Sequence, residues 1–178
     1  LDLGARNISN MVAHGFDLEV MNPAPDTARS LSLQAFKKFG NVCKASEMAL
    51  VSSIPRAAIE HNLPIAFFGE NPALQEGDYL TMGEDEIDAS KLGKLNTLGP
   101  GTIDWGQSSI PQYHLNCYDY PDQSEFSAVK LRMFYLGPVW EDWGMTENAL
   151  YSTMNGLETR LKDEQRTGDV TNASMLDE

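Results

Sequence analysis

Apolar residues recur at helical spacing in three stretches of the first 60 residues, and glycine or proline separates the stretches. The first stretch runs from Leu3 to Val12, and Gly15 follows it as a helix stop. The second, Pro25 to Phe39, carries proline in its first turn, where a missing N–H is tolerated. The third covers about 46–61 and is interrupted at Pro55, which must start a new turn or kink the helix.

Short apolar runs predict the strands. Residues Leu18 to Met21 form one candidate, closed by the turn Asn22-Pro23-Ala24-Pro25. The strongest strand signal is the apolar run from Leu63 to Phe68. An apolar run without alternation suits a strand that is covered on both faces.

The second half of the chain has fewer regular elements. Residues 79–123 are loop-rich and acidic, which is typical of a lid, a binding loop or an oligomer contact. A strand is expected over Leu131 to Leu136. Thr146 is expected to cap a helix over about 147–155. Residues 159–178 form a polar C-terminal tail with almost no apolar periodicity.

The order helix, strand, helix, helix, strand predicts parallel pairing with crossover helices, and therefore an α/β layered architecture. We expect one domain over 1–158, with the loop-rich insertion at 79–123 and the polar tail behind it. In such sheets the ligand crevice lies beyond the carboxyl ends of the strands.

Charge narrows the range of partners. The 178 residues include 26 acidic and 13 basic side chains, for a net charge of −13. Nothing in this balance would offset phosphate repulsion, so nucleic acid is not expected as a bulk partner. No apolar run approaches the roughly 20 residues that span a bilayer. The cysteines, Cys43 and Cys117, make neither a disulfide framework nor a paired metal motif, so a cytoplasmic protein without a metal site of its own is expected.

Gly69, Glu70 and Asn71 directly follow the predicted strand that ends at Phe68. A carboxylate and an amide at a strand end can bind a sugar hydroxyl, a ribose or Mg²⁺. The alternative is a plain loop start, in which Asn71 precedes Pro72 and Glu70 is solvated.

Two further residues are candidates. Arg56 follows Pro55 and could hold a phosphate or carboxylate in a bidentate fork, although a surface ion pair is the more frequent outcome. Trp140 follows the last strand and stands beside carboxylates. Aromatic rings in that setting hold sugars, but they also pack in cores and interfaces.

A series of short motifs runs along most of the chain in a recognisable order, and Ile54-Pro55-Arg56-Ala57-Ala58-Ile59 and Gly69-Glu70-Asn71 are the most diagnostic of them. In this order and spacing the chain resembles the N-acetyl sugar amidotransferases of the PP-loop ATP pyrophosphatase superfamily. The resemblance implies a Rossmann-like parallel sheet of the adenine nucleotide alpha-hydrolase-like type.

The resemblance also implies an activity. Such enzymes use ATP and Mg²⁺ to adenylate the acetamido oxygen of an N-acetyl sugar or sugar nucleotide, and ammonia then displaces AMP to give an acetamidino sugar. The products enter surface polysaccharides such as lipopolysaccharide O-antigen, or nonulosonates. Glutaminase and cyclase-like subunits supply the ammonia. By resemblance Gly69, Glu70 and Asn71 lie at the sugar or nucleotide pocket, with Arg56 nearby and Trp140 closing it.

One motif of the family is missing from this chain, which changes the activity expected of it. The family's ATP-binding loop, Ser-Gly-Gly-x-Asp-Ser, belongs on a strand-to-helix turn ahead of the segment that opens here, and it does not occur in residues 1–178. The chain starts at Leu1 and resembles a fragment that is incomplete at its N-terminus. Alone it is expected to be inactive, and exposed apolar surface at the missing elements is expected to drive homo-oligomerisation.

Two other functions stay open. The chain could belong to another PP-loop ATP pyrophosphatase, such as an NAD synthetase-like enzyme. It could also be a truncated, non-catalytic α/β module that assembles with other chains.

Overall fold

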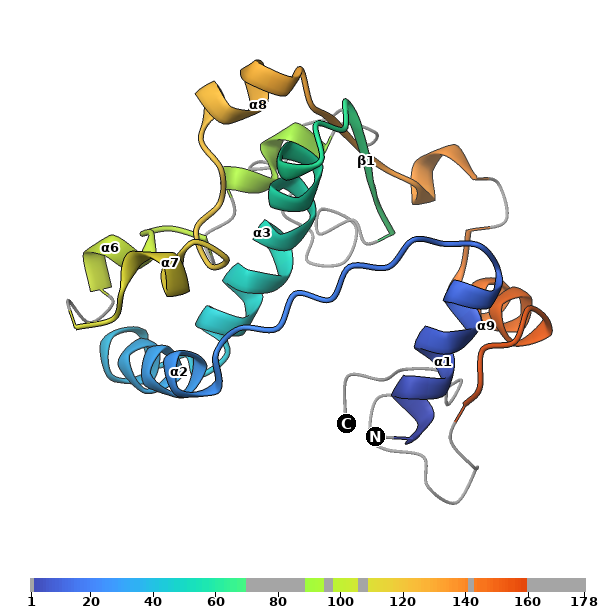
Figure 1. Ribbon diagram of the computed structural model, residues 1–178, viewed down its shortest axis with the longest axis horizontal. Coiled ribbons are helices and arrows are strands. Elements are labelled where there is room, and N and C mark those ends of the chain that lie inside the picture. Colours follow the sequence, from blue (N-terminus) through green and yellow to red (C-terminus); the bar gives the residue numbers. More distant parts are fainter. Residues whose placement is uncertain (1, 70–88, 95–97, 106–108, 141–142, 160–178) are drawn as a thin grey trace. The chain divides into compact units, whose positions relative to one another are not determined.

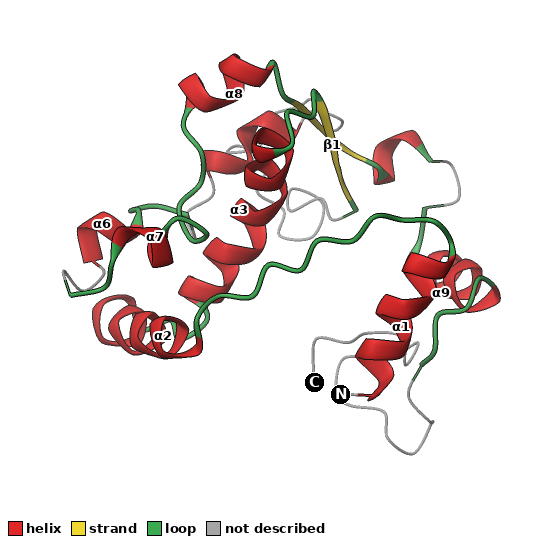
Figure 2. Cartoon of the chain, in the orientation of Figure 1, coloured by secondary structure: helices red, strands yellow, loops and turns green. Residues whose placement is uncertain are grey.

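The computed structural model describes residues 2–69, 89–94, 98–105, 109–140 and 143–159. The chain divides into two compact units, one made of residues 1–20 and 140–178 and the other of residues 21–139. A single domain over 1–158 was expected from the sequence, and this division was not. Figures 1 and 2 show the elements of each unit.

The larger unit begins with two helices. Helix α2 (Pro25–Phe39) starts at the predicted proline and ends at Gly40, whose φ of 70° only glycine adopts without strain. The Gly40 N–H donates to the Phe36 carbonyl over 2.9 Å and closes the last turn. Both predicted ends of this helix are confirmed.

Helix α3 (Lys44–Glu60) is longer than predicted and continues through Pro55 without a break. Proline removes one backbone hydrogen bond from a helix interior. Here the proline side chain is fully buried, together with Met48 and Ser52 on the same helix, so packing offsets the lost bond. Helices α2 and α3 contact each other, and Leu31 and Ala35 of α2 are completely buried.

The sheet is a parallel pair of short strands. Strand β1 (Ile65–Phe68) and strand β2 (Arg132–Tyr135) pair with Ile65 opposite Arg132 and Phe68 opposite Tyr135. Both strands were placed correctly from the sequence. The result is a mixed helical structure with a small parallel sheet, which is compatible with part of an α/β fold.

The expectation that β1 is covered on both faces is wrong for the described residues. Burial alternates along both strands: Ala66, Phe68, Met133 and Tyr135 are buried. Ile65 and Phe67 on the other face are 50% and 54% exposed. The continuous apolar run arises because both faces carry apolar side chains, although α3 contacts β1 and only one face of the sheet is buried.

Short helical segments connect the strands. They are η1 (Ala89–Lys94), α6 (Thr102–Trp105), α7 (Gln112–Leu115) and α8 (Gln123–Val129), and η2 (Gly137–Val139) follows β2. Segment η1 contacts β2, and α8 contacts α3. The expected loop-rich insertion therefore contains several single-turn helices among its described residues.

The smaller unit contains α1 (Asp2–Ala13) and α9 (Met145–Met154). Helix α1 was predicted. Helix α9 starts earlier than predicted, and its N-cap is Gly144 without a side-chain cap. The prediction that Thr146 caps this helix is wrong, because Thr146 already lies inside the first turn.

The predicted strand at Leu18–Met21 is not formed. Residues 16–24 have no regular secondary structure, and the side chain of Val20 is 66% exposed. A strand needs a neighbour for its backbone hydrogen bonds, and these residues pair with no strand among those described.

Candidate functional site

The carboxyl ends of β1 and β2 lie at the same edge of the sheet because the strands are parallel and in register. The Leu136 N–H donates to the Phe68 carbonyl over 2.9 Å, which extends the pairing to the last residue of β1. Gly69 follows β1 and is exposed at this edge. Glu70 and Asn71 lie outside the described residues, so their place in a pocket stays a prediction.

Arg56 is held by the segments that precede β2. Its Nε donates to the backbone carbonyl of Asp119 over 2.5 Å, and its Nη1 lies 3.8 Å from the Glu125 carboxylate. Arg56 is one turn from the end of α3, which leads into the amino end of β1, and α8 leads into the amino end of β2. These contacts place Arg56 toward the amino ends of the strands, whereas Gly69 follows the carboxyl end of β1.

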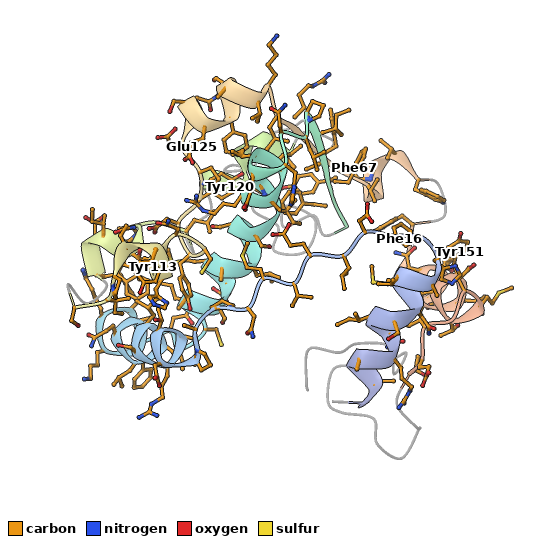
Figure 3. All side chains as sticks on the ribbon, viewed as in Figure 1. Phe16, Phe67, Tyr113, Tyr120, Glu125 and Tyr151 are labelled. Carbon is orange, nitrogen blue, oxygen red and sulfur yellow. The ribbon has the colours of Figure 1, made fainter. Side chains whose placement is uncertain are left out.

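A cavity of about 360 Å³ adjoins Arg56. Its walls come from α3, α7, α8 and the segments next to them, and Figure 3 labels Tyr113 of α7 and Glu125 of α8. The lining residues are Met21, Arg56, Ile59, Glu60, Tyr113, Asn116, Cys117 and Glu125. Burial raises the pKa of the Cys117 thiol, so the thiol is neutral in the physiological range and adds no charge.

Asp119 connects this region to α6. One carboxylate oxygen accepts the Thr102 backbone N–H and the other accepts the Thr102 hydroxyl, each over 2.7 Å. Trp105 at the end of α6 is buried and donates from its indole N–H to the Pro100 carbonyl over 3.0 Å. No sequence pattern predicts this connection, because Thr102 and Asp119 are 17 residues apart.

Lys44 is a second residue whose role no sequence pattern predicted. Its side chain is 4% exposed, and its Nζ donates to the Gly99 carbonyl over 2.9 Å and lies 5.0 Å from the centre of the Phe39 ring. Burial lowers the pKa of Lys44, and the Glu47 carboxylate partly opposes this shift. The lysine joins the start of α3 to the loop before α6.

Trp140 belongs to the smaller unit and is 61% exposed, while Gly69 and Arg56 belong to the larger one. The prediction that Trp140 closes the pocket therefore stays a prediction.

The smaller unit has a groove of about 650 Å³ beside α1 and α9. Polar side chains of α1 bind the segment behind α9: Asn10 Nδ2 donates to the Gly156 carbonyl, and His14 Nε2 lies 2.6 Å from the Asn155 carbonyl oxygen. Apolar residues of the groove include Phe16 and Tyr151, both labelled in Figure 3 and both exposed.

A site for ATP and Mg²⁺ stays a prediction. No group of three or more His, Cys, Asp or Glu side chains within them is placed to hold a metal ion. Arg56 Nε donates to the Asp119 carbonyl and Nη1 lies 3.8 Å from the Glu125 carboxylate, and a phosphate contact of Arg56 stays a prediction.

Comparison with models of known protein families found no match, and no curated protein matches the chain. No helix in the described part of the chain has the length and apolar character needed to cross a membrane.

Proposed function

We propose that the chain is part of an ATP-dependent N-acetyl sugar amidotransferase, which converts a sugar acetamido group to an acetamidino group for surface polysaccharide synthesis. One observation carries the proposal beyond the motif order: β1 and β2 are parallel and in register, and the diagnostic Gly69-Glu70-Asn71 motif begins at their shared carboxyl edge. This is the edge at which parallel α/β sheets bind small ligands.

In this proposal the chain contributes the strand-end loop that orients the sugar. Carboxylate and amide groups such as those of Glu70 and Asn71 suit sugar hydroxyls. The ATP-binding loop lies in a longer parent protein that works in the cytoplasm with glutaminase and cyclase-like subunits. The chain by itself is inactive.

The test is ATP-to-AMP conversion by the product of the complete reading frame, with an N-acetyl sugar nucleotide and ammonia supplied. AMP release that depends on both supports the proposal. Glu70→Gln and Asn71→Ala should then lower turnover, and Glu147→Gln, an exposed acid of α9, is the matched control. If the complete protein releases no AMP with any N-acetyl sugar in a panel, the proposal is contradicted. AMP release with deamido-NAD would favour the NAD synthetase-like alternative.

A non-catalytic, assembling module is the second candidate, because one face of the sheet exposes Ile65 and Phe67. Parallel sheets are normally covered on both faces. On this reading the chain forms homo-oligomers. Light scattering at micromolar concentration tests it: Phe67→Asp should shift an oligomer toward monomer, whereas a wild-type chain that is already monomeric contradicts self-association.

A further inference from the structure

The cavity beside Arg56 contains hydrogen-bond donors that no described residue uses. Arg56 has five N–H donors. Among the described residues it makes one hydrogen bond, from Nε to the Asp119 carbonyl. Nη1 forms an ion pair with Glu125 at 3.8 Å, which is too long for a hydrogen bond. The side chain of Arg56 is 24% exposed and lines the cavity. Its terminal nitrogens can therefore receive a ligand carboxylate in a two-point contact.

Two carboxylates line the cavity, one from α3 and one from α8. Glu60 is four residues after Arg56 on α3, so the two side chains share a helix face, and Glu60 has no hydrogen bond or ion pair among the described residues. The second carboxylate is that of Glu125, one oxygen of which accepts the Asp122 N–H over 2.8 Å. Glu60 is thus free to receive an ammonium group.

The rest of the lining is apolar or neutral. Met21 and Ile59 provide aliphatic surface, and the Tyr113 ring and the Cys117 thiol complete it. A volume of about 360 Å³ is at the small end of ligand cavities.

We propose that this cavity binds a small zwitterion, namely a free α-amino acid with an aliphatic side chain. The carboxylate pairs with the terminal nitrogens of Arg56, the ammonium with Glu60, and the side chain packs on Met21 and Ile59. The site is separate from the carboxyl edge of the sheet and does not depend on the sugar chemistry proposed there.

Charge selects this ligand over simpler ones. An anion without an ammonium group would be repelled by Glu60 and Glu125 and would leave the Glu60 carboxylate without a ligand partner. A cation without a carboxylate could pair with Glu60 but would leave the terminal donors of Arg56 without a ligand partner. A molecule that carries both charges close together can pair with Arg56 and with Glu60 at the same time.

The test compares three matched compounds by amide-resolved NMR titration of the 178-residue chain: L-valine, isovalerate, which lacks the ammonium, and isobutylamine, which lacks the carboxylate. L-Valine should bind with a dissociation constant of about 1 mM and shift the amide signals of Asn116 and Cys117. The two single-charge compounds should bind about tenfold more weakly or worse.

Two variants locate the contacts. Glu60→Gln should weaken L-valine binding about tenfold, because the ligand ammonium loses its charged partner. The fold should not change, because Glu60 is exposed and makes no hydrogen bond or ion pair among the described residues. Asp17→Asn, an exposed acid of the smaller unit, is the control and should leave binding unchanged. Equal binding of isobutylamine or isovalerate, an unchanged affinity in Glu60→Gln, or no amide shift at about 50 mM L-valine overturns the proposal.

Discussion

Asn7 engages both backbone hydrogen-bonding groups of Glu158: its Nδ2 donates to the Glu158 carbonyl over 3.0 Å, and the Glu158 N–H donates to its Oδ1 over 2.8 Å. A side-chain amide here makes the pair of bonds that a neighbouring strand would make. Asn7 is also 7% exposed, although large apolar residues of the same helix, such as Val12, are about half exposed. In the described part of the smaller unit, α1 is thus attached to the segment behind α9 mainly by polar contacts.

Asn7→Ala should release this attachment. The substitution leaves two backbone groups of Glu158 without their partner, which costs about 2 kcal/mol. Hydrogen exchange of the Glu158 amide should become faster. Ser9→Ala is the control, because the Ser9 hydroxyl only donates to the Ala5 carbonyl on its own helix. Unchanged exchange at Glu158 in Asn7→Ala would contradict the assignment.

The two neighbouring phenylalanines of β1 should respond differently to truncation. Phe68 is 8% exposed and Phe67 is 54% exposed. Phe68→Ala should lower the free energy of unfolding by about 3 kcal/mol, the cost of a core cavity. Phe67→Ala should cost less than about 1 kcal/mol. Urea denaturation of both variants checks this, and equal losses would mean that the second face of the sheet is covered in solution.

The side chain of Asp119 should be needed for α6. Asp119→Ala removes the acceptor of both Thr102 bonds and should cost about 2 kcal/mol of stability. Asp104→Ala, an exposed acid in the same helix, is the matched control and should change the midpoint of urea denaturation little. A similar shift in both variants would show that the Thr102 contact adds nothing of its own.

The stability of the chain should depend on pH through Lys44. Its pKa is lowered from an ordinary value of 10.5, so the unfolded chain holds this proton more tightly than the folded one. Burial of the charge therefore costs stability below the folded-state pKa. That cost disappears as pH rises from the folded-state pKa through 10.5.

The measurement is the difference in unfolding free energy between wild type and Lys44→Met. Wild type should gain stability relative to the variant as pH rises through that alkaline window. A constant difference between wild type and Lys44→Met would mean that the Lys44 pKa is the same in both states.

Elements with local start and stop signals could be predicted from the sequence. Pro25 and Gly40 act on the backbone within one turn, so both ends of α2 were placed correctly. Strand β1 was found because its apolar run ends at Gly69. The position of Gly69 at the carboxyl edge followed from the same signal.

Features that depend on distant residues could not be predicted. The partner of Arg56 is the backbone of Asp119, 63 residues away, and a backbone carbonyl carries no sequence signal. Burial of one face of β1 is likewise decided by what packs on it. One missed element did have a signal: Asp122 and Glu125 form a capping box at the start of α8, and their spacing is visible in the sequence.

The parallel pairing of β1 with β2 has a consequence for how the chain folds. Each strand residue meets a partner 67 positions later, as Ile65 does Arg132. The intervening chain must close into a loop before pairing stabilises it, so contacts between residues this far apart in sequence form slowly. Helices α2 and α3 are close in sequence and can associate first. On a ribosome, β1 would emerge long before its partner exists, and its apolar side chains would need protection from other chains until β2 arrives.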